Sequence, residues 1–243
     1  RCRNNCRTSS IQQRSSEGRM TIGGAPPDWI SAFPRQPVEA AAATLQQAWQ
    51  ELVRRNAPGF QPKDREDRLT AKLKFHCDTV ARKRGLLGSW SAENKVGNLD
   101  VESGDIIWQK RTDISFHWND DQQTMVFVFE FKKVSHTVTS RKAYLGDDGM
   151  GRFVDGYYSQ DETAAAMVAL LTGPEEKIVP NLQHSLSDGS YEAKLRQRKN
   201  GSSKLITQPS QVIALAAFDT DHDRSNNRAP IRLAHIFLGW PTP

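Results

Sequence analysis

The segment TMVFVFEFKKV, residues 124–134, decides the fold because it is the most strand-like part of the chain. Its Val and Phe residues are typical of a buried central strand. Successive side chains of a strand point to opposite faces, so the three phenylalanines share one face while Glu130 and Lys132 share the other. A carboxylate and an ammonium beside an apolar strand are costly unless they pair or bind something. This pair therefore indicates a candidate functional site.

The preceding segment, residues 105–118, also alternates at its end and carries Asp113. A polar turn separates it from the Val/Phe strand. If the two strands form an antiparallel hairpin, any even-numbered loop places Asp113 on the face of Glu130 and Lys132, and a two-residue turn at 121–122 sets Asp113 directly opposite Glu130. An odd-numbered loop without a bulge would place these groups on opposite faces, and no shared site would form.

Two converging carboxylates and a lysine have a definite chemistry. The carboxylates are suited to a hard divalent cation such as Mg²⁺ (or Mn²⁺), which takes oxygen ligands and keeps several waters. Such a cation stabilises charge on a phosphoryl oxygen and lowers the pKa of a bound water. Lys132 can position that water or stabilise the developing anion. These are the parts required to hydrolyse a phosphodiester.

The sequence Thr112-Asp113-Ile114, followed by a hydrophobic residue, Glu130, Phe131 and Lys132, resembles the PD-(D/E)xK superfamily of restriction-endonuclease-like nucleases. Thr112 stands where the motif has Pro. The resemblance implies an α/β fold with a restriction-endonuclease-like core, a mixed central sheet flanked by helices, and helical N-terminal additions. The family order of helix, three strands, helix and strand is matched, within about 60–220, by a helix at 64–84, strands in 105–134, a helical stretch after 141 and a strand at 211–218.

The resemblance also implies roles for individual residues. Asp113, Glu130, Lys132 and Glu66 would be catalytic, and the three carboxylates would hold the metal. The activity implied is that of a Mg²⁺-dependent endonuclease acting on DNA in bacterial restriction, phage defence or repair. A homodimer would supply the two sites needed to cut both strands. For Glu66 the alternative is a carboxylate favoured by the helix dipole at a helix start.

Basic and aromatic residues after the catalytic strand are candidates for contacts with the phosphate backbone. We expect Arg141, Lys142, Tyr144 and Arg152 to line the cleft, and His117 to face substrate from the side of Asp113. Solvated helix charges and a structural histidine are the alternatives. The glycines in this segment lack the Gly-Lys-Ser/Thr of a P-loop, so no nucleoside triphosphate is expected.

Charge and composition add weaker constraints. Of the net charge of +5, residues 1–19 contribute four, from five Arg and one Glu. Residues 63–95 and 188–204 carry local basic surpluses, either as phosphate-facing patches or as solvated faces. No apolar run approaches the ~18–20 residues needed to span a bilayer, so we expect a cytoplasmic protein without a membrane segment. Three cysteines do not indicate a disulfide scaffold.

The remaining segments complete the expected organisation. We expect residues 1–22 to be a disordered basic tail, with Met20 a candidate original start, and residues 23–243 to form one domain. Further expectations are a helix from about 38 to 52, a loop or weak strand at 89–104, an apolar block of either type at 161–171, a short helix at 175–186, strands at 211–218 and 231–238, and a polar loop rather than a metal site at 219–223.

Two other functions remain open. The first is a catalytically inactive module with the same fold, which binds nucleic acid or a protein partner. The second is a hydrolase with paired carboxylates and no metal, such as a glycosidase, although such sites have no need of a lysine two residues from the acid.

Overall fold

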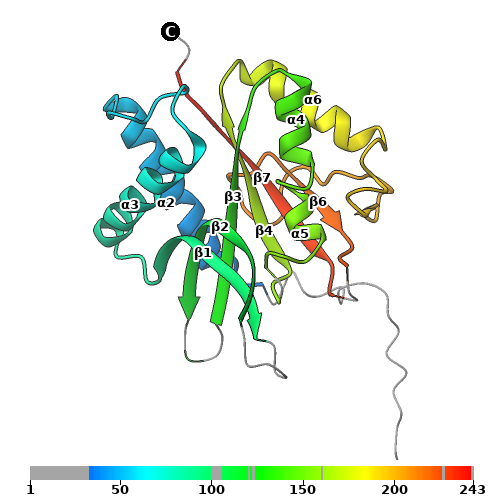
Figure 1. The fold of residues 1–243 in the computed structure, drawn as a ribbon, viewed down its shortest axis with the longest axis horizontal. Coiled ribbons are helices and arrows are strands. Elements are labelled where there is room, and N and C mark those ends of the chain that lie inside the picture. Colours follow the sequence, from blue (N-terminus) through cyan, green and yellow to red (C-terminus); the bar gives the residue numbers. More distant parts are fainter. Residues whose placement is uncertain are drawn as a thin grey trace, which may run out of the picture.

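The computed structural model describes residues 33–99, 106–119, 121, 124–159, 161–225 and 228–241. These residues form an α/β fold in which helices flank a mixed sheet (Figure 1). The sheet has seven strands in the order β1-β2-β3-β4-β7-β6-β5. The strands are β1 Ser89–Leu99, β2 Ile106–Asn119, β3 Thr124–Val134, β4 Ala164–Leu171, β5 Gln197–Arg198, β6 Phe218–His222 and β7 Ile231–Gly239.

The sheet combines an antiparallel and a parallel part. β1 pairs with β2 and β2 pairs with β3 in antiparallel fashion, whereas β3, β4 and β7 are parallel to one another. β6 and β5 then add two antiparallel strands at the far edge. The mixed sheet predicted from the sequence is therefore confirmed.

Helices cover the two faces of the sheet and enclose two apolar cores. Helices α2 (Arg35–Arg54) and α3 (Glu66–Arg84) pack on one face, where the phenylalanines of β3 point. Helices α4 (Val138–Leu145), α5 (Gly151–Val154) and α6 (Glu175–Ser187) pack on the other face, against Val128. The two groups of helices stand on opposite sides of the strands in Figure 1.

The pairing of β2 with β3 meets the register condition set by the sequence. Ile114 lies opposite Phe129, and Asn119 lies opposite Thr124. One further step of this register places Asp113 opposite Glu130. Asp113 therefore belongs to the face that carries Glu130 and Lys132, as an even-numbered connection requires.

Two segments with ambiguous patterns are strands. Residues 89–99 form β1, although their sequence has little strand character, because they pair with β2 along its length. Residues 164–171 form β4, all eight of which are buried between β3 and β7. Tertiary pairing outweighs the helical preference of an alanine-rich segment at this position.

The predicted strand at 211–218 is wrong. Only Phe218 of that range lies in a strand, and β6 continues from it to His222, through most of the segment 219–223 that was predicted to be a polar loop. The physical reason is Asp219, whose carboxylate accepts hydrogen bonds from Ser210 Oγ (2.5 Å) and the backbone N–H of Gln211 (2.6 Å). These bonds hold residues 210 and 211 in an irregular loop, and apolar Val212 and Ile213 pack into the core without forming a strand.

The expectations for the N-terminal tail at 1–22 lie outside the described residues. Across the described ranges, no helix has both the length and the apolar character needed to cross a bilayer.

Candidate functional site

The candidate site forms where β2 and β3 stop pairing. Beyond Phe129, two N–H groups on the β2 side of β3 bond to side chains instead of to a strand. The N–H of Phe131 donates to Asp113 Oδ2 at 2.8 Å, and the N–H of Lys133 donates to Glu66 Oε2 at 2.6 Å. Because Glu66 is the first residue of α3, the end of this hairpin and the start of a helix converge on one short stretch of strand.

Glu130 is the centre of the site. Its side chain is completely buried. Its Oε1 accepts hydrogen bonds from Lys132 Nζ (3.0 Å) and Arg152 Nη1 (2.9 Å). Its Oε2 is buried and has no hydrogen-bond partner among the described residues. A buried carboxylate oxygen without a donor is costly, and such exceptions in native structures call for an explanation.

Lys132 links two of the carboxylates. Its ammonium donates to Glu66 Oε1 at 3.1 Å, to Glu130 Oε1 at 3.0 Å and to the carbonyl of Phe131 at 2.7 Å. Burial by itself lowers the pKa of Lys132, but the neighbouring carboxylates outweigh it and raise that pKa above its usual value. Lys132 is therefore a cation that positions or stabilises an anion, and not a base that accepts a proton.

The two central carboxylates are held away from their ordinary ionisation. Burial raises the pKa of Glu130 to about 8, and the charge of Asp113 adds to this, against the opposing effects of Lys132 and Arg152. Burial also raises the pKa of Asp113. Neighbouring carboxylates with raised pKa values are typical of functional sites, although structural ion pairs also produce such shifts.

Arg152 enters the site from α5. Its Nη1 donates both to Glu130 Oε1 and to the hydroxyl of Tyr158, at 2.9 and 2.6 Å. The guanidinium carbon also lies 5.5 Å from the centre of the Tyr158 ring, and Tyr158 is completely buried. The turn before α5 includes Gly149, where an added Cβ would overlap the carbonyl oxygens of Tyr144 and Ala143. The tight backbone of this turn therefore determines where Arg152 lies.

The donor set at Glu130 fits a cation. The unpartnered Oε2 of Glu130 is an acceptor that a divalent ion would satisfy, and Asp113 has an oxygen beyond the one that bonds to Phe131. Glu66 differs, because both of its oxygens are engaged, by Lys132 and by the backbone of Lys133. Within the described ranges, no group of three or more His, Cys, Asp or Glu side chains lies in an arrangement that would hold a metal ion. Of the three predicted ligands, Asp113 and Glu130 are therefore the better pair.

The prediction that Tyr144 contacts DNA is wrong. The side chain is completely buried on the inner side of α4. Its hydroxyl bonds to His235 Nδ1 at 2.9 Å, inside the core on the α4 face of the sheet. Its basic neighbours in the sequence indicate a surface contact, but its position on the helix directs the ring to the core.

The other residues predicted to contact nucleic acid differ in how deeply they are buried. Arg152 meets Glu130 within the site, which is deeper than a helix-surface arginine would lie. On α4, Lys142 is exposed and Arg141 is partly buried. His117 is half-buried on β2, and its Nε2 lies 2.8 Å from Ser91 Oγ of β1. Contacts of Arg141, Lys142 and His117 with nucleic acid stay predictions.

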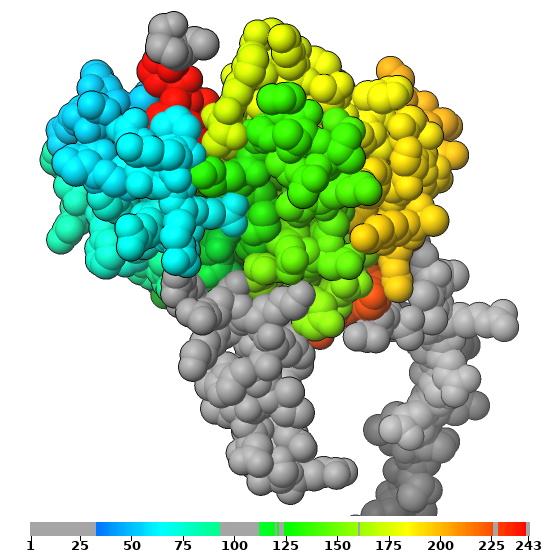
Figure 2. All heavy atoms as spheres, turned by 45° about the horizontal axis from the view of Figure 1, so that its top comes forward, coloured from blue at the N-terminus to red at the C-terminus, as the bar shows by residue number. Residues whose placement is uncertain are grey.

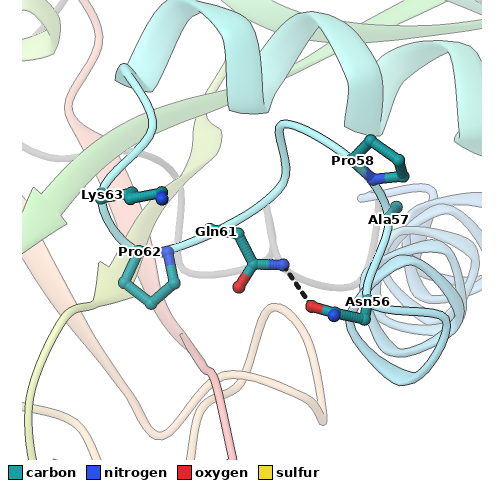
Figure 3. Close-up of a pocket in the computed structure, with 6 residues that line it drawn as sticks. All are labelled: Asn56, Ala57, Pro58, Gln61, Pro62 and Lys63. Atoms are coloured by element: carbon teal, nitrogen blue, oxygen red, sulfur yellow. Dashed lines mark hydrogen bonds between the residues drawn. The ribbon is translucent and has the colours of Figure 1, made fainter.

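The surroundings of the site come from segments far apart in the sequence. Figure 2 shows the loop between α2 and α3, in cyan, next to the β3 and α4 region, in green, and Lys133 Nζ bonds to the carbonyl of Asp64 at 2.9 Å across this junction. The same loop is hollowed into a pocket, where Gln61 donates to Asn56 Oδ1 at 2.6 Å (Figure 3). Lys63 lines this pocket and comes shortly before Glu66 in the sequence. A basic side chain is therefore close in sequence to the site.

Tyr158 is the member of the site that sequence reasoning missed. It follows Gly156 in the segment DGYYSQ, where neither periodicity nor spacing marks a functional tyrosine. Only the turn that carries α5 brings its hydroxyl to Arg152.

No family model, no curated protein and no solved structure matches this chain.

Proposed function

We propose that this protein is a metal-dependent nuclease that hydrolyses phosphodiester bonds in DNA, with a site of the PD-(D/E)xK type on a restriction-endonuclease-like core. The observation that carries the proposal is the buried Glu130, whose Oε2 has no partner among the described residues while Asp113 and Lys132 converge on the same face. Supporting it, Asp113 lies on β2 where its pairing with β3 stops, Glu130 and Lys132 follow on β3, and Glu66 begins the preceding helix.

In this proposal Asp113 and Glu130 hold a Mg²⁺ or Mn²⁺ ion, through oxygen atoms of the kind these ions prefer. When bound, the ion supplies Lewis-acid stabilisation of the phosphate and an acidified water. Lys132 remains charged and stabilises the developing negative charge beside Glu130. Glu66 fixes the Lys132 ammonium through its 3.1 Å ion pair and thus acts as a positioning residue.

A non-catalytic module is the second candidate, and one observation favours it. Glu130 Oε1 is already paired with two cations, and Glu66 is fully bonded. A closed ion-pair cluster of this kind can serve to fix the fold alone. It leaves Glu130 Oε2 unexplained, however, and for that reason we favour the nuclease.

Incubation with supercoiled plasmid in Mg²⁺ or Mn²⁺, with EDTA as the metal-free control, tests the proposal. The wild-type protein should convert the plasmid to nicked or linear forms. Glu130→Gln and Lys132→Met should each reduce the rate by roughly 10²–10³-fold, while DNA binding in a gel-shift assay is retained. Binding without any cleavage by the wild type would favour the non-catalytic module. Cleavage that is unaffected by EDTA would contradict the metal.

A further inference from the structure

A second contact, with Tyr158, holds Arg152 against Glu130. The same Nη1 that donates to Glu130 Oε1 donates to Tyr158, whose ring lies beside the guanidinium. Tyr158 is completely buried, and its ring packs edge-on against that of Phe153 in α5, with ring centres 5.6 Å apart. The position of Arg152 beside the carboxylate is thus part of the packed structure and not one conformer of a free side chain.

Two complementary atoms in this pair lack partners among the described residues. One is an acceptor, Glu130 Oε2, and the other is a donor, Arg152 Nε; both are buried. An ion pair made only for stability would leave both desolvated and unpaired, which is unfavourable for each of them. A ligand that satisfies both must offer a donor or a cation to the carboxylate and an acceptor oxygen to the guanidinium. A divalent ion together with a phosphate group does so.

The charges of the site also favour a divalent ion together with a phosphate group. When all three carboxylates are ionised, as metal binding requires, Asp113, Glu130 and Glu66 contribute three negative charges, and Lys132 and Arg152 contribute two positive charges. The ionised cluster then has one net negative charge, so a divalent ion alone would leave it positive in a buried place and close to two cations. A phosphate group beside the ion removes that excess. Each ligand should therefore strengthen the binding of the other, by the same factor.

Resting on the nuclease proposed above, we propose that Arg152, positioned by Tyr158, makes binding of the divalent ion depend on a phosphate group in the same site. The protein without nucleic acid then holds metal weakly, with Arg152 as the counter-ion of Glu130. Arrival of a phosphate completes the site, and a metal-loaded centre forms where there is substrate.

Mn²⁺ binding to the full chain, measured by electron paramagnetic resonance with and without thymidine 5′-monophosphate, tests this coupling without relying on activity. Binding of Mn²⁺ to the nucleotide itself is subtracted from a protein-free titration. For the wild type, the nucleotide should lower the Kd for Mn²⁺ by at least ~5-fold. In Arg152→Gln the effect should fall below about twofold, and Tyr158→Phe should give an intermediate value. Lys177→Gln, on the exposed side of α6, is the matched control and should behave as the wild type does.

The outcomes separate the two proposals. A folded wild type that binds no Mn²⁺ with or without nucleotide overturns both the nuclease and the coupling. Equal Mn²⁺ affinity in the two conditions leaves the metal site standing and overturns the coupling. Coupling of full size in a folded Arg152→Gln overturns the role of Arg152.

Discussion

The backbone N–H of Phe131 donates to the carboxylate of Asp113 at 2.8 Å, at the point where the β2–β3 ladder ends. Asp113 thereby replaces the strand partner that β3 lacks there. Glu66 does the same for Lys133, two residues further along. These carboxylates therefore have a structural role in addition to their proposed roles in the site, and for Asp113 the two roles can be separated by substitution.

Asp113→Asn and Asp113→Ala should differ in stability but not in activity. Asparagine keeps an oxygen that accepts from Phe131 but loses the charge that a cation requires. Alanine leaves the N–H of Phe131 without its partner, which costs roughly 1–3 kcal/mol of unfolding free energy. Urea unfolding should show a loss for Asp113→Ala and little change for Asp113→Asn, while both variants lose plasmid cleavage. Full cleavage by Asp113→Asn would remove Asp113 from the metal site.

Lys132 and Glu130 should be strongly coupled. Removing one partner of a buried ion pair leaves an uncompensated charge, so Lys132→Met should lower the unfolding free energy by ~3 kcal/mol. Neutralising Glu130 as well, in Lys132→Met/Glu130→Gln, should recover a large part of that loss. The double-mutant cycle in urea unfolding measures the coupling. Additive losses in the cycle would show that the 3.0 Å contact contributes little.

Acid should destabilise the protein through a buried hydrogen-bond chain behind α4. His222 Nδ1–H donates to the carbonyl of Leu195, so its Nε2 accepts from the hydroxyl of Thr220. Thr220 in turn accepts from His235 Nε2–H, and His235 Nδ1 accepts from Tyr144. Every donor in this chain is used only when both histidines are neutral. Burial accordingly lowers the pKa of His222 to about 4, and it also lowers the pKa of His235 well below its usual value.

The sign of the pH effect follows from the direction of these shifts. The unfolded state binds a proton on His222 near pH 6.5, whereas the folded state resists protonation down to about 4. The neutral state of His222 therefore contributes its full stabilisation above pH 6.5. This contribution is lost as the pH falls from 6.5 towards 4, and the unfolding free energy decreases by about 2 kcal/mol between pH 7 and 5. Urea unfolding at pH 7 and at pH 5 should show that the His222→Gln variant lacks this loss of unfolding free energy. Exposed His184→Gln is the control, and an unchanged pH response in His222→Gln would contradict the neutral chain.

Gly149 should be required for the position of Arg152. A Cβ at this residue would overlap backbone oxygens of α4, so Gly149→Ala must displace the turn before α5. We expect a loss of unfolding free energy of roughly 1–3 kcal/mol and a lower Mn²⁺ affinity in the presence of nucleotide. Gly201→Ala is the matched control, because an added Cβ there has no atom within 4 Å. Equal behaviour of the two alanine variants would show that the turn adapts without moving Arg152.

The central hairpin was predictable because its physics is local. Alternation in 124–134 and a polar turn were sufficient to place Asp113 on the face of Glu130, since strand parity leaves only two outcomes. The contact of Arg152 with Glu130 and Tyr158 was not predictable, because it depends on a turn whose path is fixed by backbone packing. Strand β6 was missed for a related reason: Thr220 and His222 are polar in sequence but buried through their hydrogen bonds to each other and to His235.

A crystal structure of the protein grown with Mn²⁺ and thymidine 5′-monophosphate, with anomalous data collected at the manganese edge, shows whether Asp113 and Glu130 share a metal ion. We expect one peak with carboxylate oxygens of both Asp113 and Glu130 at about 2.0–2.5 Å. We also expect the nucleotide phosphate within hydrogen-bond distance of Arg152 Nε. A map with no peak at these carboxylates, and with Glu130 Oε2 still unpartnered, would contradict the proposed metal site.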